Sequence, residues 1–162
     1  MSQYSGDIRG VMIPVTGGRV LLPNATVAEV ITYSDPTPIA DTPPWLLGHL
    51  SWRGWRLPLF SFAMLSGMAA GEGYSNAKVT VLKALGKRAR LPFMAMLAQG
   101  FPRLTTLNAD VIVPGGDGSE TPAGVYDYVM VRDDDAVIPD LGAVEQMLAD
   151  ALQLPADEPA EA

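Results

Sequence analysis

The sequence predicts an all-β protein with a single long helix near its C-terminus. Fourteen prolines and sixteen glycines are spread along the 162 residues. This punctuation suits many short strands and argues against a helical bundle. Four pairs of apolar segments each flank a short turn, which is typical of β-hairpins. Only residues 140–153 repeat their apolar side chains at helical spacing.

Two hairpins, an intervening strand and a short helix are predicted in the first half. The hairpin turns fall at Thr16-Gly17-Gly18 and at Arg53-Gly54. Between the hairpins, segment 26–32 should begin as a helical turn and end as a strand. The other predicted elements of this half are strands 11–15, 19–22, 50–52 and 55–60 and a helix at 62–65 that Gly67 stops.

The second half follows a small, polar connector at residues 67–77 and repeats the hairpin pattern. Its turns are expected at 86–88 and at the acidic run 133–135, and segment 113–124 reads as a loop. Asp140 stands where it can cap the long helix, whose apolar face has Leu141, Val144, Leu148 and Leu152. The predicted strands are 78–85, 90–98, 103–107, 125–131 and 136–139.

The two halves show a weak internal repeat. A glycine turn followed by a strand ending in proline occurs at 18–23 and again at 86–92. Later in each half, a turn leads through a strand to a proline and then a helix. The halves, about 8–66 and 78–154, are therefore expected to form two small barrels that close their own strand edges. The alternative is that unrelated hairpins simply resemble one another.

Composition and charge limit the possible functions. The hydrophobic fraction of 48% supports a packed core, and the net charge of −7 opposes binding to nucleic acid or to an anionic membrane surface. The sequence has no cysteine, which excludes disulfides and thiolate chemistry. Residues 1–10 do not resemble a secretory signal, and no apolar run approaches the roughly 18 residues of a membrane span. We expect a cytoplasmic protein without direct membrane insertion, and a disordered acidic tail at 155–162.

Catalytic motifs are scarce. His49 is the only histidine, and no serine lies in a nucleophile-elbow sequence. The glycines at 115–118 lack the lysine and the helix of a phosphate-binding loop, and the contiguous aspartates at 133–135 lack the alternate spacing of a calcium loop. We therefore expect no enzyme, no metal and no cofactor.

Residues 45–60 contain all three tryptophans and two arginines. Tryptophan and arginine dominate protein–protein hot spots, because they combine a large contact area with directional donors. The same tryptophans could instead fill small barrel cores. Arg53 lies at a turn between two apolar strands, so its guanidinium should be exposed.

The chain resembles the CheW domain family over about residues 8–152. Four pieces carry the resemblance in the family's order: the apolar-x-Glu segment 27–31, the proline stretch 37–40, a short helix at 43–48, and the Arg-Gly hairpin and proline strand at 51–59. The sequence departs from the family where Phe60-Ser61-Phe62 replaces the usual Val-Asp-Leu, so it resembles a divergent member, similar to ChpC-like adaptors of type IV pilus chemosensory systems that control twitching motility.

The resemblance implies two subdomains, each a five-stranded SH3-like barrel, within one domain spanning 1–154. It implies a non-catalytic adaptor that binds the regulatory domain of a CheA-type histidine kinase and the cytoplasmic tip of a chemoreceptor, which a groove between the barrels would receive. The matched Glu29 and Arg53 should lie close together. The residues expected at the partner surface are Val27, Glu29, Gly48, Trp52, Arg53 and Gly54.

Two other classes of function remain. A double barrel could bind a small molecule or nucleotide between its halves and act as a ligand sensor. A small enzyme is the weaker alternative, since active sites usually need several converging titratable groups. A pull-down of a kinase or receptor would indicate the adaptor, whereas a ligand-dependent melting shift would indicate the sensor.

Overall fold

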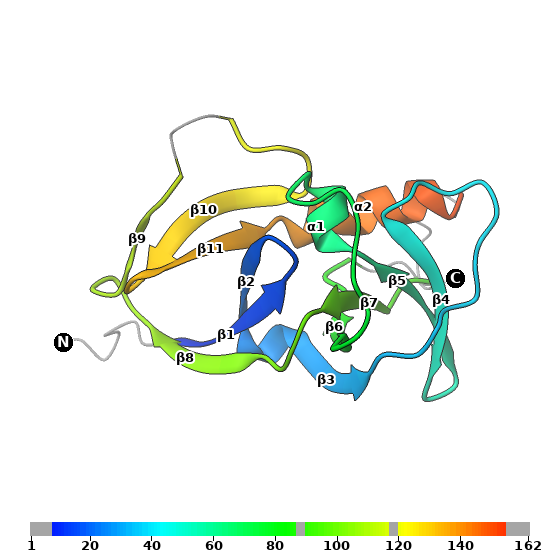
Figure 1. Ribbon diagram of the computed structural model, residues 1–162, viewed down its shortest axis with the longest axis horizontal. Helices are drawn as coiled ribbons and strands as arrows, with labels where there is room; N and C mark the ends of the chain where they lie inside the picture. The colour runs from blue at the N-terminus through cyan, green and yellow to red at the C-terminus, as the bar shows by residue number, and fades with distance from the viewer. Residues whose placement is uncertain (1–7, 87–89, 117–119, 155–162) are drawn as a thin grey trace.

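The structure is a computed structural model that describes residues 8–86, 90–116 and 120–154 (Figure 1). Two short helices and a 3-10 turn at Asn24–Thr26 accompany the strands; the helices are α1 (Phe62–Leu65) and α2 (Leu141–Ala151). The strands are β1 (Ile8–Val15), β2 (Gly18–Pro23), β3 (Val27–Thr32), β4 (Leu46–Trp52), β5 (Trp55–Phe60), β6 (Lys78–Lys83), β7 (Phe93–Ala98), β8 (Arg103–Leu107), β9 (Ile112–Pro114), β10 (Val125–Val131) and β11 (Asp134–Pro139).

The strands form two sheets. The six-stranded sheet has the order β8-β1-β2-β11-β10-β9 and lies on the left of Figure 1, whereas the five-stranded sheet has the order β3-β6-β7-β5-β4 and lies on the right. Each sheet forms an SH3-like barrel, which confirms the predicted all-β fold with two barrels. One sheet has six strands instead of the expected five. The start of the predicted loop 113–124 belongs to strand β9, which pairs with β10.

The sheets do not coincide with the two sequence halves. The first hairpin, β1–β2, leaves the first half to pair with β8 and β11, and the hairpin β6–β7 pairs with β3 and β5. Each half therefore gives its first hairpin to the other half's sheet, which corrects the expectation of two consecutive barrels at 8–66 and 78–154. The exchange pairs strand edges that each half would leave open by itself.

The predicted repeat is present in the structure. Hairpins β4–β5 and β10–β11 close on two-residue turns, with Trp52 opposite Trp55 and Val131 opposite Asp134. Both hairpins have a register shift at the same distance from the turn, and a capped helix follows each. Asp140 caps α2, as predicted. At the start of α1, Ser61 accepts a hydrogen bond from the Met64 amide.

Two predicted details are wrong. Segment 43–48 is not a helix: β4 begins at Leu46, and His49 pairs with Thr37 through two backbone hydrogen bonds of 2.8 and 2.9 Å, which hold this stretch extended. The turn of the last hairpin is Arg132-Asp133 rather than the three aspartates, because Arg132 adopts a φ of 58° and Asp134 already begins β11. The predicted tail 155–162 lies outside the described residues.

The largest core cluster joins the two sheets to both helices. Its fully buried members include Ile13 of β1, Phe60 of β5, Phe62 of α1 and Leu148 of α2. Two smaller clusters consist of the inward-facing residues of the five-stranded sheet and of the six-stranded sheet, respectively. Because one cluster contacts both sheets, the barrels are packed as one body.

Candidate partner-binding surface

The edge strands of the five-stranded sheet are β3 and β4, and three side chains connect them. Glu29 lies in β3, whereas Trp52 ends β4 and Arg53 begins the turn. Glu29 Oε1 accepts a hydrogen bond from Trp52 Nε1 at 2.9 Å and two from Arg53, from Nε at 3.1 Å and Nη2 at 2.8 Å. The predicted proximity of Glu29 and Arg53 is therefore present, and it links two strands that are far apart in the sheet order.

The turn conformation directs the Arg53 side chain. Arg53 and Gly54 have φ values of 49° and 82°, the left-handed pair that a tight two-residue hairpin turn requires. The guanidinium carbon lies 5.2 Å from the centroid of the Trp52 ring, so the cation also contacts an aromatic face. The Arg53 side chain nevertheless remains 69% exposed and Glu29 35%. The pair is fixed in place and still accessible to a partner.

Hydrogen bonding keeps Glu29 charged. The pKa of Glu29 lies below its ordinary value of 4.5, first because Trp52 donates to the carboxylate and then because Arg53 does, while desolvation acts in the opposite direction. Since the negative charge is compensated within the site, the surface presents a nearly neutral ion pair beside an aromatic area.

Phe93 and two tryptophans form that aromatic area. Phe93, the first residue of β7, packs edge-on against Trp52 with ring centroids 4.9 Å apart and against Trp55 at 6.1 Å. Trp55 is 43% exposed. The predicted site residues do not include Trp55 or Phe93. Trp55 lies in the tryptophan-rich segment, but no local motif marks Phe93, which only the pairing of β7 with β5 brings here.

The predicted site residues divide into two groups. Glu29, Trp52, Arg53 and Gly54 lie together at the hairpin tip. Gly48 is instead buried in the bulge of β4, where it has a φ of 145° and its Cα lies against the Thr37 carbonyl. Val27 is half-buried and packs against the main core cluster. Gly48 can therefore affect the surface only by shaping the backbone beneath it, whereas the side chain of Val27 stays partly exposed.

A family model described as the CheW-like domain matches residues 9–147. The chain belongs to the CheW-like domain family. It is similar to a crystal structure of the scaffolding protein TtCheW from Thermoanaerobacter tengcongensis, with a TM-score of 0.69 and 15% sequence identity over 87% of this chain and 89% of that chain. No curated protein matches the sequence significantly.

Membership in the family establishes the class of function. This CheW-like protein is a chemotaxis adaptor that acts as a non-catalytic scaffold. Because the identity to TtCheW is only 15%, that likeness supports the fold rather than particular residues. Among the described residues, neither helix has the length and hydrophobicity that crossing a bilayer requires.

Proposed function

We propose that this CheW-like protein couples a chemoreceptor to a CheA-type histidine kinase in the cytoplasm, through the surface formed by Glu29, Trp52, Arg53 and Gly54. The observation that supports this proposal most directly is an exposed arginine held by a carboxylate and an aromatic ring. A side chain that is ordered before binding loses little rotational freedom when the partner arrives. Gly48 and Val27 would support this surface from below.

The two partners should use different chemistry. The regulatory domain of the kinase is proposed to bind the aromatic area around Trp55 and Phe93, whereas the cytoplasmic tip of the receptor engages Arg53 and its neighbouring charges. Salt screens charges and leaves apolar contacts largely unaffected. Kinase binding should therefore depend weakly on salt, and receptor binding should weaken as salt increases.

Calorimetry with the purified partners tests the proposal. Binding of the kinase regulatory domain should have micromolar affinity, about −8 kcal/mol, as for modest transient interfaces. Arg53→Ala should weaken receptor binding, whereas Arg56→Ala, which removes an exposed arginine from the neighbouring strand β5, should not. Absence of heat with the cognate kinase domain at tens of micromolar, together with a melting shift on adding a nucleotide or metabolite, would favour the ligand sensor instead.

The output pathway is part of the same proposal. The departures from the family pattern at Phe60-Ser61-Phe62 suggest a ChpC-like adaptor of a type IV pilus system rather than a flagellar one. Deletion of the gene should then impair twitching motility and leave swimming intact. Loss of swimming alone would assign the adaptor to flagellar chemotaxis.

A further inference from the structure

The shared plan of the two sheets gives each residue at the tip of hairpin β4–β5 a counterpart at the tip of hairpin β10–β11. In the five-stranded sheet, one row of paired residues runs through Leu59, Ala95, Val81 and Glu29. In the six-stranded sheet, Val137 pairs with Val20, so the next residues of these parallel strands, Ile138 and Leu21, are also opposite each other. The corresponding row of this sheet therefore runs through Ile138, Leu21, Met12 and Arg103. Leu59 and Ile138 stand at the same distance from their turns, so Arg103 occupies the position of Glu29.

The neighbouring positions also differ in chemistry. Arg132 begins its turn as Arg53 does, with a φ of 58°. Arg19 corresponds to Phe93, because each lies two residues before its strand's member of the row, Leu21 and Ala95 respectively. Asp134 corresponds to Trp55. An aromatic area with one balanced ion pair is thus replaced by three arginines around one aspartate, which we call the arginine cluster (Arg19, Arg103, Arg132 and Asp134).

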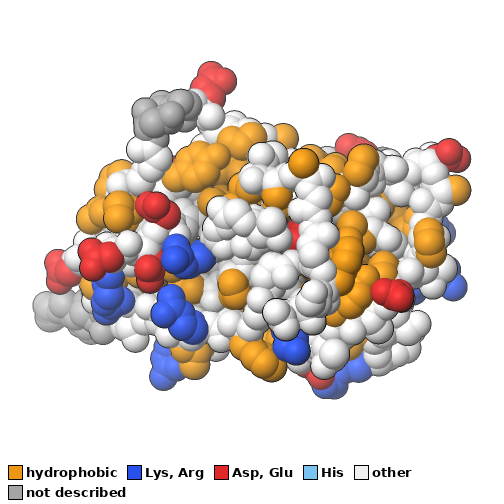
Figure 2. All heavy atoms as spheres, viewed as in Figure 1, with side chains coloured by type: hydrophobic (Ala, Val, Ile, Leu, Met, Phe, Trp, Pro, Cys, Tyr) orange, Lys and Arg blue, Asp and Glu red, His pale blue; other side chains and the backbone are white. Residues whose placement is uncertain are grey.

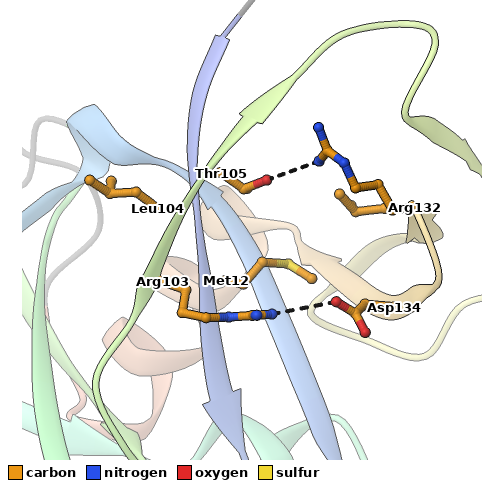
Figure 3. A pocket seen from close by; sticks show the side chains of 7 residues that line it. Met12, Arg103, Leu104, Thr105, Arg132 and Asp134 are labelled. Carbon is orange, nitrogen blue, oxygen red and sulfur yellow. Dashed lines mark hydrogen bonds and ion pairs between the residues drawn. The ribbon is translucent and has the colours of Figure 1, made fainter.

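The single carboxylate in the arginine cluster is shared. Arg103 Nη2 lies 3.4 Å from Asp134 Oδ2, and Arg19 Nη2 lies 3.7 Å from Asp134 Oδ1. Arg132 Nη1 reaches only the hydroxyl of Thr105, at 3.4 Å, and within the described part of the chain it has no carboxylate at ion-pair distance. Figure 3 shows Arg103 directed toward Asp134, and Arg132 toward Thr105.

The arginine cluster surrounds a hollow in the surface. Two adjoining cavities of about 190 and 380 Å³ share Met12, Arg103 and Asp134 in their walls. The larger one also has Phe101, which is 69% exposed and has Lys78 Nζ 4.9 Å from its ring centroid. Figure 2 shows several Lys and Arg side chains at this left-hand end of the molecule, interspersed with Asp and Glu side chains and with apolar ones.

We propose that the arginine cluster is a second docking surface, which binds a carboxylate-bearing segment of a partner protein. The equivalent place in the other sheet shows the fit, because there a carboxylate accepts bonds from the turn arginine. Guanidinium groups bind carboxylates through paired, charge-assisted hydrogen bonds. Phe101 offers an apolar contact beside them, which suits a segment that carries leucine or valine next to its acidic residues.

A polyanion such as RNA fits this surface less well. The protein carries a net charge of −7, and Asp134 stands in the middle of the three arginines. Phosphate backbones gain affinity from many cations along an extended track, whereas this hollow is short. A protein segment with one or two carboxylates matches both its charge and its size.

Fluorescence anisotropy with the full-length protein tests the proposal. The probe is a labelled helical peptide of about 15 residues with glutamate and leucine at i and i+4 spacing, and its partner peptide has glutamine in place of every glutamate. The glutamate peptide should bind with submillimolar affinity, and the glutamine peptide at least about tenfold more weakly. Increasing salt should reduce the difference between them.

Variants locate the binding. The double variant Arg103→Gln and Arg132→Asn removes two cations. Asparagine tolerates the left-handed conformation that position 132 has in the turn. This variant should bind the glutamate peptide about tenfold more weakly than the wild type does. Arg56→Gln removes an exposed arginine from the five-stranded sheet and should leave binding unchanged. A melting curve close to that of the wild type shows that the double variant is folded.

Several results would overturn the proposal. These are equal binding of the two peptides, no binding of either at about millimolar concentration, and unchanged binding by the folded double variant. Tighter binding of an oligouridylate than of the glutamate peptide would assign the arginine cluster to nucleic acid instead, and competition by inorganic phosphate alone would reduce it to a simple anion site.

Discussion

Arg53 donates two hydrogen bonds to the same carboxylate oxygen of Glu29, and in doing so it connects the two edge strands of the five-stranded sheet. The Trp52 indole donates to that oxygen as well. Both charged side chains remain open to solvent. The contact therefore orients Arg53 but contributes little to the stability of the fold.

Arg53→Ala should leave thermal stability almost unchanged. Exposed ion pairs contribute little because solvent screens them and ordering two long side chains costs entropy. We expect a melting temperature within about 4 °C of the wild type by circular dichroism, together with impaired signalling in a motility assay. Global unfolding of the variant would show that Arg53 is structural.

Gly48→Ala should destabilise the protein by about 1–3 kcal/mol. Gly48 has a φ of 145°, and an added Cβ would collide with the backbone carbonyl of Thr37. Urea unfolding measures the change. Gly71→Ala is the matched control, because an added Cβ there meets nothing within 4 Å and its φ is not left-handed. Equal stability of the two variants would contradict the role assigned to Gly48.

Glu145→Ala should lower the free energy of unfolding by about 2–4 kcal/mol. Glu145 is buried in α2 and accepts hydrogen bonds from the backbone amides of Leu85 and Gly86, the latter at 2.8 Å. Its removal leaves these donors without their acceptor and detaches α2 from the end of the β6–β7 hairpin. Gln146→Ala, on the exposed side of the same helix, should change the free energy of unfolding by less than about 0.5 kcal/mol.

Glu72→Ala should loosen the connector between the two halves. The Glu72 carboxylate accepts from Thr16 at 2.6 Å, from Gln99 at 3.0 Å, and from Ser61, which caps α1. Amide hydrogen exchange should accelerate in residues 67–77 and at the start of α1. Glu120→Ala, an exposed change in another loop, should leave this exchange as in the wild type.

Stability should fall as the pH decreases below the ordinary histidine range. Burial, followed by the nearby Arg56 charge, lowers the pKa of His49 below 6.5, so the unfolded state binds the proton more tightly. The contribution of His49 is therefore complete above about pH 6.5 and is lost as the pH falls toward its lowered folded pKa. The lowered pKa of Glu29 adds a second loss that begins below about pH 4.5.

Urea unfolding at about pH 5 and about pH 8 measures the histidine effect. His49 is the only histidine, so His49→Gln should remove the part of the pH dependence that lies around pH 6. An unchanged profile in this variant would show that carboxylates alone account for the dependence.

The local features of this protein follow from residues that lie close together in the chain. Turn residues such as Arg53-Gly54 and the helix cap Asp140 act within a few residues of their position, so the hairpins, the capped helix and the repeat between the halves were predictable from spacing. The pairing of Glu29 with Arg53 was predictable only through the family resemblance, because 24 positions separate them in the chain.

Tertiary structure alone decided which hairpin joins which sheet. The β1–β2 hairpin pairs with β11, more than a hundred residues away, and nothing in its own sequence records that partner. Other long-range pairings had the same kind of effect. The bridge between Thr37 and His49 holds β4 extended, the pairing of β7 with β5 brings Phe93 beside Trp52, and the pairing of β8 with β1 places Arg103 where the other sheet has Glu29. A strand's edge can hydrogen-bond to any other edge, so the choice among edges depends on which arrangement buries the shared core, a property of the whole chain.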